Sequence, residues 1–417
     1  MTQDPKGTRD HPPRKARAKE TIRQTIRRHA QRHGFRPLQT PIIENRDILT
    51  SKFTGGEEIL KEMYTLTDQG ERSLGLRYDL TVPFARFVSE HPELKFPFKR
   101  YQNGPVFRDG PVKPGRYREF EQFDLDIIGD TSNASDAELI SIVYKVLRDL
   151  GLNPEIQVNT REFLYGVIDH VGIDRGRADG VVLTIDKYEK KGREGVIEEL
   201  VEKGVPPETA TELLDTLNVE GNNKDLIETF SDITDTERLN DLHRYLEAQR
   251  VEYTFNPYLA RGLTYYTGTI FEAFAPQTSF TSSIAAGGRY DDMIGNLSKN
   301  QSPCAVGASF GVDTLLDATT GDENPNKDAV YVAPLTSLEH VYPVCRELRE
   351  VVDVTLGTPS KGFRKHLDYA DKEGYTYLVV YGDNEVENDA FEVKNLRTGE
   401  TRKGDIETIK DALHETF

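Results

Sequence analysis

The chain has 417 residues, more than one ordinary hydrophobic core organises, so two or three domains are expected. Asp and Glu outnumber Lys and Arg by 70 to 53, and the net charge of −17 argues against nucleic-acid binding through bulk positive charge. Binding through local basic patches stays open.

Cysteine content and hydropathy indicate the cellular compartment in which the protein resides. The two cysteines, Cys304 and Cys345, lack the spacing of metal ligands, which indicates a reducing environment. No apolar run approaches the roughly 20 residues that a membrane helix needs, and residues 1–20 lack the apolar core of a secretion signal. We therefore expect a soluble cytoplasmic protein without membrane contact.

A helix and an extended segment are the first predicted elements. Residues 13–33 predict a helix whose basic side chains fall on several faces, which favours a solvated helix, and Gly34 suits its C-terminal cap. In "FRPLQTPIIE", residues 35–44, Pro37 and Pro41 remove backbone donors. That segment is expected to be an edge strand or an interface strand.

A hairpin and a helix come next. Residues 63–66 and 74–77 read as strands joined by a turn at 68–70, and residues 80–91 read as a helix. These elements lead into the most charged strand pair of the chain.

The stretch "GPVFRDGPVKPGRYREFEQFDLDIIG", residues 104–129, predicts strand, charged loop and strand. Because side chains alternate along a strand, Gln122, Asp124 and Asp126 share one face and apolar residues share the other. Two interpretations stay open here. The polar face is either the wet side of a half-buried strand or a binding floor, with carboxylates for a cation and nearby arginines for an anion.

The remaining chain alternates helices and strands in three blocks. A helix at 136–150 and a strand at 155–159 are followed by the Glu-rich region 172–250, which reads as a helical insertion. Strand-like sequence resumes at 253–259, 266–274 and 282–290. Residues 317–328 read as a polar linker, and 329–417 alternate strand and helix as a small α/β domain.

Several motifs resemble, in order, those of the histidyl-tRNA synthetases, a family of class II aminoacyl-tRNA synthetases. They are "KGTRD", "FRPLQTPIIE", "LRYDLTVPFAR", "GRYREFEQFDLDI", "RGLTYYTG", "AAGGRYDDMI" and "AVGASFGVD". The tail "SKGFRKHLDYADKEGYTYLVVYGDNEV" is similar to the anticodon-binding domain of that family. The resemblance covers nearly the whole chain, and "RGLTYYTG" with "GGRYD" is its most specific part.

The resemblance implies an α+β catalytic core, with an antiparallel sheet flanked by helices, at 1–171 and 251–316. It implies a helical insertion at 172–250, the linker at 317–328 and a C-terminal α/β domain of the anticodon-binding type at 329–417. The implied activity is that of a homodimeric histidine–tRNA ligase. With ATP and Mg²⁺ it would activate L-histidine to histidyl-adenylate and transfer it to the 3′ end of tRNA(His).

The histidine contacts follow from the same resemblance. It places Asp79, Thr81 and Gln122 at the α-ammonium group of histidine, and Asp126 and Tyr266 at its imidazole ring. A carboxylate on one ring nitrogen and a phenol on the other would reject Gln and Asn by geometry, and Phe by an unmet polar group.

The anion contacts are also implied. Tyr265 and Arg261 would complete the histidine site. Arg108 and Arg261 would hold the α-phosphate of ATP from two sides as catalytic groups, and Arg116 would meet the outer phosphates. Adenylation joins two anions, so positioning and charge stabilisation supply the rate, and no protein nucleophile is needed. No direct protein ligand for a metal is assigned.

Four positions depart from the family pattern or lack a role in it. Thr314 stands where motif 3 usually has an arginine, Gly110 where motif 2 usually has an acidic residue, and Thr264 where an Asp is common. Asp124 maps to no known ligand role and is expected to be either a supporting residue or a solvated one.

Two alternative functions are weighed, and a tRNA-binding surface is predicted. A non-catalytic paralogue resembling the regulatory subunit of ATP phosphoribosyltransferase is the runner-up, while a synthetase for another amino acid fails on the histidine motifs. For tRNA, a basic patch is expected at Lys361, Arg364 and Lys365, with Lys113 facing the acceptor end.

Overall fold

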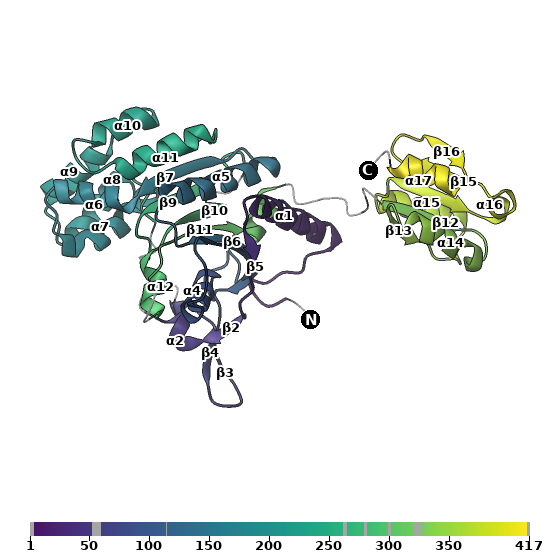
Figure 1. Ribbon diagram of the computed structural model, residues 1–417, viewed down its shortest axis with the longest axis horizontal. Helices are drawn as coiled ribbons and strands as arrows, with labels where there is room; N and C mark the ends of the chain where they lie inside the picture. Colours follow the sequence, from purple (N-terminus) through teal and green to yellow (C-terminus); the bar gives the residue numbers. More distant parts are fainter. Residues whose placement is uncertain are drawn as a thin grey trace. The chain divides into compact units, whose positions relative to one another are not determined.

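The structure is a computed structural model that describes residues 4–51, 60–113, 115–261, 265–278, 282–298, 302–319, 326 and 329–414. The chain divides into two compact units (Figure 1). Residues 1–10 and 18–321 make up the first unit, and residues 11–17 and 322–417 make up the second.

An eight-stranded, mainly antiparallel sheet organises the first unit. In spatial order its strands are β1 (Arg36–Pro37), β5 (Phe98–Phe107), β6 (Glu119–Ile128), β11 (Ala305–Gly311), β10 (Ala285–Arg289), β9 (Thr269–Phe274), β7 (Glu155–Thr160) and β8 (Thr254–Phe255). The edge strands β1 and β8 pair in parallel with their neighbours, and the six strands between them are antiparallel.

One face of this sheet carries the main hydrophobic core, and helices cover it. The covering helices are α1 (Pro13–Arg32), α5 (Asn133–Asp149) and α11 (Glu237–Ala248). Phe123, Leu125 and Ile127 of β6 point into this core because they alternate with the polar side chains of the same strand. The polar side chains are thereby directed to the opposite face.

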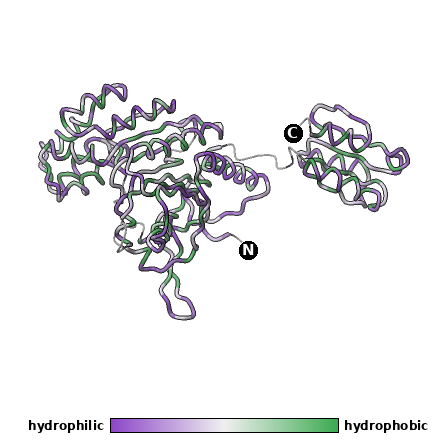
Figure 2. Tube along the Cα trace, viewed as in Figure 1, coloured by the Kyte–Doolittle hydropathy of each residue, from purple (hydrophilic) through white to green (hydrophobic). Residues whose placement is uncertain are grey.

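A small sheet and short helices lie at the other side of the first unit. The sheet has the order β2 (Ile43–Asn45), β4 (Ser73–Leu76) and β3 (Thr65–Thr67), and the β3–β4 hairpin projects from the rest of the unit with a hydrophilic tip (Figures 1 and 2). The helices are α2 (Arg46–Leu49), α4 (Thr81–Glu90) and α12 (Asp292–Leu297). α13 (Val312–Ala318) instead packs into the main core beside α1.

Between β7 and β8 the chain is almost entirely helical. The helices are α6 (Arg161–His170), a 3₁₀ turn at Arg175–Arg177, α7 (Ala178–Ile185), α8 (Tyr188–Glu202), α9 (Pro207–Leu217), α10 (Asn223–Phe230) and α11. Gly192 interrupts α8 with a φ of 67°. Most of these helices share one apolar core, which includes Phe163 of α6 and Tyr266 beside the large sheet.

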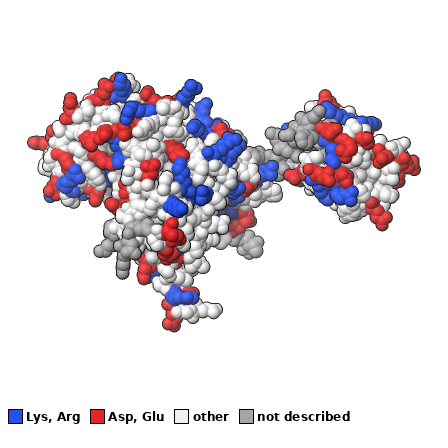
Figure 3. Space-filling model, viewed as in Figure 1, with Lys and Arg blue, Asp and Glu red and all other residues white. Residues whose placement is uncertain are grey.

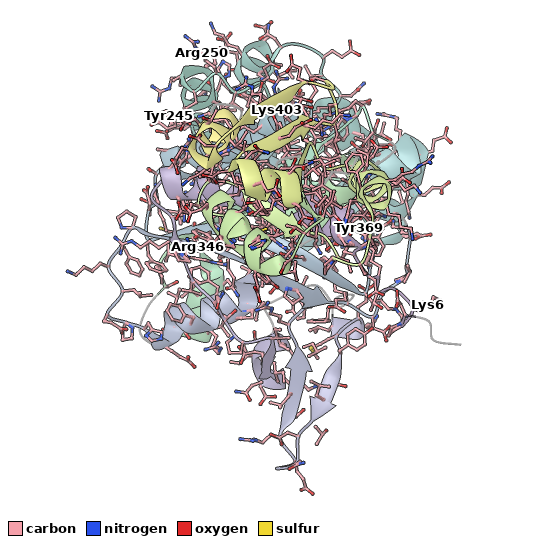
Figure 4. All side chains as sticks on the ribbon, turned by 90° about the vertical axis from the view of Figure 1, so that its right-hand side faces the viewer. Lys6, Tyr245, Arg250, Arg346, Tyr369 and Lys403 are labelled. Carbon is pink, nitrogen blue, oxygen red and sulfur yellow. The ribbon has the colours of Figure 1, made fainter. Side chains whose placement is uncertain are left out.

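The second unit has a five-stranded mixed sheet with helices on both faces. Its elements in chain order are β12 (Ala329–Pro334), α14 (Leu338–Leu348), β13 (Asp353–Leu356), α15 (Phe363–Lys372), β14 (Tyr377–Tyr381), α16 (Asp383–Asn388), β15 (Phe391–Asn395), β16 (Thr401–Gly404) and α17 (Ile406–His414). α14 and α17 pack into one core and α15 into another. Figure 4 labels Arg346 on α14 and Tyr369 on α15.

Most predicted elements are confirmed, including the edge position of the segment with Pro37. The prediction that the first helix is solvated is wrong for one face of α1. Ile22, Ile26 and Ala30 are buried there, and the buried Lys19 forms an ion pair with Asp313 at 3.0 Å. Basic residues on the remaining faces hide this narrow apolar stripe in the sequence.

The beginning of the predicted linker belongs to a helix. α13 ends at Ala318, and Asp317 in its last turn forms an ion pair with Arg9 at 2.8 Å. Residues 320–325, 327 and 328 of the predicted linker lie outside the described residues. Within the described part of the chain, no helix has the length and apolar character to cross a membrane.

One buried ion pair ties β10 to α5. Arg289 is 1% exposed and Asp136 is not exposed, and Arg289 Nε donates to Asp136 Oδ1 at 3.2 Å. Arg289 also donates to the backbone carbonyls of Asp130 and Ser132, each at 3.0 Å. The guanidinium therefore fixes the start of α5 against the sheet.

Replacing Arg289 by Ala should lower the free energy of unfolding of the first unit by about 3–5 kcal/mol, because a buried carboxylate loses its partner. Chemical denaturation followed by circular dichroism measures this change. Arg244→Ala is the matched control, because Arg244 pairs with Asp241 on an exposed helix surface, and it should leave the transition unchanged. Equal stability of both variants would contradict the structural role of Arg289.

Candidate active site

A cavity of about 270 Å³ opens on the polar face of the large sheet. Most of the side chains predicted for the site line it, together with small residues of β10 and β11. The predicted residues among them are Asp79, Thr81, Arg108, Gln122, Asp126, Arg261, Tyr265 and Tyr266, and Asp124, for which no ligand role was predicted, lines the cavity as well. The fold thus gathers into one cavity residues from four separate stretches of the sequence.

β6 lines the floor of this cavity, and its neighbour β5 supports β6 from outside the cavity lining. Antiparallel pairing places Gly104 opposite Gln122, Gln102 opposite Asp124, and Arg100 opposite Asp126. Asp124 and Asp126 are only 3% and 2% exposed, so the polar face of β6 is not the wet side of a sheet. The wet-face interpretation is therefore wrong, and the binding-floor interpretation stays a prediction.

Two neighbours hold Asp126 in place. Arg100, which is fully buried, forms an ion pair with Asp126 Oδ2 at 2.7 Å. The hydroxyl of Tyr290 donates to Asp126 Oδ1. Burial raises the pKa of Asp126, while Arg100 and Tyr290 oppose this rise. Gly307 leaves the carboxylate its space, because a Cβ at this position would collide with Asp126 Oδ1.

Gln122 and Asp124 are linked through one hydroxyl. Gln122 Nε2 donates to Ser309 Oγ at 3.0 Å, and Ser309 hydrogen-bonds the Asp124 carboxylate. Burial raises the pKa of Asp124 to about 7, with Arg100 opposing the shift and Asp126 adding to it. The expectation of a solvated Asp124 is therefore wrong.

Asp79 and Thr81 lie where α4 begins. The backbone amide of Val82 donates to Asp79 Oδ1 at 3.0 Å, so Asp79 binds the N-terminal turn of the helix. Burial raises the pKa of Asp79 to about 6, although this hydrogen bond and the nearby Arg108 favour the charged form. Asp79 is 8% exposed and faces the cavity.

Two arginines from separate segments line the same cavity. Arg108 Nε donates to the backbone carbonyl of Tyr78 at 3.0 Å, and burial lowers the pKa of Arg108. Arg261 Nε lies 3.6 Å from Glu272 Oε1, and its guanidinium carbon lies 5.2 Å from the centre of the Tyr266 ring. Among the described residues, Nη1 of Arg261 has no hydrogen-bond partner. This nitrogen is available to an anion.

The tyrosine pair packs into space left by a glycine. The ring centres of Tyr265 and Tyr266 lie 4.7 Å apart. A Cβ at Gly288 would lie 2.7 Å from Tyr266 Cδ1, and a Cβ at Gly287 would collide with the backbone of Gly307. The two glycines thus leave room for protein groups, and both also line the cavity.

The structure does not bring every predicted residue into the cavity. Arg116 lies outside its lining and pairs with Glu62 at 2.6 Å. Gly110 faces the same Glu62, since a Cβ there would lie 2.6 Å from Glu62 Cδ. Thr314 lies in α13, outside the cavity lining. Thr264 lies outside the described residues.

Three residues that hold the floor in place were missed at the sequence level: Arg100, Tyr290 and Ser309. A signal for Arg100 exists, because Arg100, Gln102 and Gly104 alternate with the same period as the polar face of β6. Tyr290 and Ser309 lie within recognised motifs, but only the antiparallel pairing shows which neighbour each one touches.

Within the described ranges, no group of three or more His, Cys, Asp or Glu side chains gathers as a metal site. The cavity does contain carboxylates, but Asp126 is occupied by Arg100 and Tyr290. A Mg²⁺ ion bound mostly by phosphate oxygens and water needs only one or two protein carboxylates. The residues present fit that mode and do not form a site made of protein ligands alone.

Comparisons with known proteins agree with this geometry. Residues 7–315 match the histidyl-tRNA synthetase family model, and residues 329–416 match the anticodon binding domain model. The chain is similar to histidine--tRNA ligase 1 of Bacillus cereus, with 38% identity over 423 residues that span 99% of this chain and 97% of that protein.

Two solved structures extend the comparison. A histidyl-tRNA synthetase from Nostoc sp. PCC 7120 superimposes with a TM-score of 0.88 at 25% identity, covering 100% of both chains. A protein from Bacillus halodurans, described as an ATP phosphoribosyltransferase regulatory subunit/histidyl-tRNA synthetase, gives a TM-score of 0.74 at 21% identity, covering 91% of this chain and 98% of that one. The second likeness shows a shared fold alone.

The mixed α+β unit with its polar cavity is that of a class II synthetase, joined to an anticodon-binding region. The chain belongs to the histidyl-tRNA synthetase family.

Proposed function

We propose that this chain, a histidine–tRNA ligase by family, joins histidine to ATP in the cavity on the large sheet and then transfers the histidyl group to the 3′ end of tRNA(His). The observation that carries this proposal is the composition of the cavity. Buried carboxylates line its floor, and two arginines from distant segments line the same space. Such a site suits a ligand pair with a cation at one end and phosphates at the other.

Histidine is proposed to bind along the floor. Asp79, Thr81 and Gln122 would accept the α-ammonium group, and Asp126 would accept the imidazole N–H opposite Tyr266. Asp126 is suited to this role because Arg100 and Tyr290 hold its carboxylate in one orientation. A fixed acceptor discriminates better than a mobile one, since a ligand without the matching donor leaves a buried group unpaired.

Arg108 and Arg261 are proposed to act on the α-phosphate. A carboxylate oxygen of histidine attacks the α-phosphorus, and pyrophosphate leaves with the electron pair of the broken P–O bond. The arginines would offset the repulsion between the two anions and the charge that develops at phosphorus. Because Nη1 of Arg261 has no partner among the described residues, its contact with the phosphate needs no prior bond to break.

Arg116 and Mg²⁺ are proposed to contact the outer phosphates of ATP. Arg116 would have to exchange Glu62 for a phosphate oxygen, and its exposed position allows that change of partner. When bound, Mg²⁺ supplies charge neutralisation of the β- and γ-phosphates.

Arg261→Ala should abolish histidine-dependent ATP–pyrophosphate exchange, which the unmodified protein should catalyse, because Arg261 is assigned to charge arising at phosphorus. The affinity for histidine should change only by about threefold. Calorimetric titration with histidine and the exchange assay measure the two effects. If histidine binding collapses while turnover at saturation survives, the assignment is wrong.

The ATP–pyrophosphate exchange assay also distinguishes the ligase from the alternative, a non-catalytic regulatory paralogue. A regulatory protein would bind histidine without exchanging pyrophosphate into ATP. Arg108 and Arg261 both line the cavity, which favours the ligase, since a histidine sensor needs no phosphate contacts. We also propose the domain limits predicted above, with the catalytic core extended to the end of α13 at Ala318, together with a cytoplasmic location.

tRNA binding is proposed to involve α15 in the second unit. Arg364 and Lys365 are exposed near the beginning of the helix, and Lys361 lies 5.2 Å from the ring centre of Tyr369. Acidic and basic side chains are interspersed over the molecular surface shown in Figure 3. A protein with this charge distribution contacts RNA through short basic patches and not through a uniform field. Lys113, which is exposed in the first unit, is proposed to face the acceptor end.

Replacing Lys361, Arg364 and Lys365 together by Ala should weaken tRNA charging and leave pyrophosphate exchange intact. The log–log salt dependence of tRNA affinity should lose about one unit for each phosphate contact removed. Arg346→Ala with Arg349→Ala on α14 is the control, since α14 packs into the other core of this unit. Unchanged charging by the triple variant would remove α15 from the tRNA surface.

A homodimer is proposed through the segment that contains Pro41. Ile42 and Ile43 are adjacent and are 39% and 52% exposed, which is unusual for large apolar side chains beside an edge strand. Burial against a second copy would remove this apolar surface from water.

Ile43→Asp should shift the protein from dimer toward monomer in sedimentation equilibrium, because a charge would be buried at the interface. Val201→Asp is the control, since Val201 is a comparably exposed apolar residue on α8, at 39%. An Ile43→Asp protein that stays dimeric at the same concentrations would contradict this interface.

A further inference from the structure

Asp124 has no role in the site proposed so far. It lies between Gln122 and Asp126 on the cavity floor, is 3% exposed and lines the cavity. Its Oδ1 has no hydrogen-bond partner among the described residues, and the same holds for Gln122 Oε1. Two acceptors without donors therefore meet at successive positions of one strand face.

The hydroxyl of Ser309 binds the other polar atoms of Gln122 and Asp124, which leaves Gln122 Oε1 and Asp124 Oδ1 without donors among the described residues. Ser309 accepts a hydrogen bond from Gln122 Nε2 at 3.0 Å and hydrogen-bonds Asp124. This bridge engages one N–H of Gln122 Nε2 and orients the carboxylate of Asp124. Each of the two side chains keeps one buried oxygen without a donor in the described part of the chain.

We propose that Asp124 accepts a hydrogen bond from the α-ammonium group of histidine, which it shares with Gln122. The inference rests on the proposed function and adds a specificity-determining residue to it. An ammonium group has three N–H donors, whereas a neutral imidazole has one. Asp79 and Thr81 would each take one N–H, and Gln122 and Asp124 would share the third. The ammonium group suits Asp124 because a desolvated carboxylate is stabilised by a paired cation.

The carboxylate proposed for the imidazole ring already has partners in the protein. Asp126 is bound by Arg100 and by Tyr290. Asp126 can still accept one imidazole N–H, but its Oδ2 already lies 2.7 Å from a nitrogen of Arg100. Among the described residues, Asp124 Oδ1 has no hydrogen-bond donor, and Asp124 lines the cavity. The floor thus separates two tasks, with Asp124 and Gln122 at the ammonium and Asp126 at the ring.

The charge state of Asp124 should make histidine affinity depend on pH. Burial raises its pKa to about 7, so the carboxyl group of the empty site is partly protonated near neutral pH. A bound cation favours the ionised form, and the proton must therefore leave when histidine binds. The charged and titratable groups that face Asp124 are Arg77, Asp79, Arg100, Asp126, Tyr266 and Tyr290.

The test compares three ligands on the full-length protein and its Asp124→Asn variant by calorimetric titration. L-Histidine and L-histidinol carry the ammonium group, and imidazolepropionate lacks it. Asp124→Asn should weaken the first two by about tenfold or more, because a charge-assisted hydrogen bond becomes a neutral one. Imidazolepropionate should bind both proteins with affinities within about threefold, since its contact with Asp124 is absent in each.

The pH profile supplies a second readout. Histidine affinity of the unmodified protein should rise between pH 6 and pH 8 more steeply than that of Asp124→Asn, since only the former releases a proton from this carboxyl. The titration of free histidine contributes equally to both profiles. The KM for ATP serves as the internal control and should stay unchanged.

Two results would overturn the inference. Equal weakening of all three ligands would assign Asp124 to the imidazole or to the shape of the site, and no weakening at all would leave it without a ligand contact. If Asp124→Asn does not fold, Ser309→Ala takes its place and should weaken only the two ligands with an ammonium group. If the unmodified protein catalyses no histidine-dependent ATP–pyrophosphate exchange, the proposed function is wrong, and this result is independent of the role of Asp124.

Discussion

The burial of carboxylates on one face of β6 is the constraint on which the rest of the first unit depends. Removing a carboxylate from water costs several kcal/mol unless a partner compensates it. Arg100 supplies that partner from the neighbouring strand, and antiparallel pairing places it directly opposite Asp126. The opposite face of the same strand belongs to the apolar core. The sheet therefore separates charge from hydrocarbon across the thickness of a single strand.

The position of Arg261 in the cavity lining depends on backbone geometry. Arg261 has a φ of 48°, a left-handed conformation that a non-glycine residue adopts only when its surroundings hold it there. One restraint is the buried Arg161, whose Nη2 donates to the Arg261 carbonyl at 3.2 Å. Because Arg161 opens α6, the guanidinium of Arg261 is positioned from the helical region between β7 and β8. That region thus contributes to the cavity without lining it with a residue of its own helices.

The sequence allowed the strand pair, the polar face of β6 and the set of residues around the cavity to be predicted, because a period of two and distinctive motifs are local signals. It did not allow the burial of Asp124 to be predicted, since exposure depends on what covers a face. The partners Arg100 and Ser309 come from other strands, and only register defines them. The apolar stripe of α1 was missed because arginines surround it.

The register between β5 and β6 has a consequence for how such a protein can change over time. A slip of one residue would turn Phe123, Leu125 and Ile127 into the cavity and the carboxylates into the core, so a chain with that error would not persist. The register that folding requires therefore also decides which side chains of β6 line the cavity. Few inherited changes on this strand can alter that lining while leaving solubility intact, and a new lining is more readily reached from the loops that contribute Asp79 or Arg261 than from the strand itself.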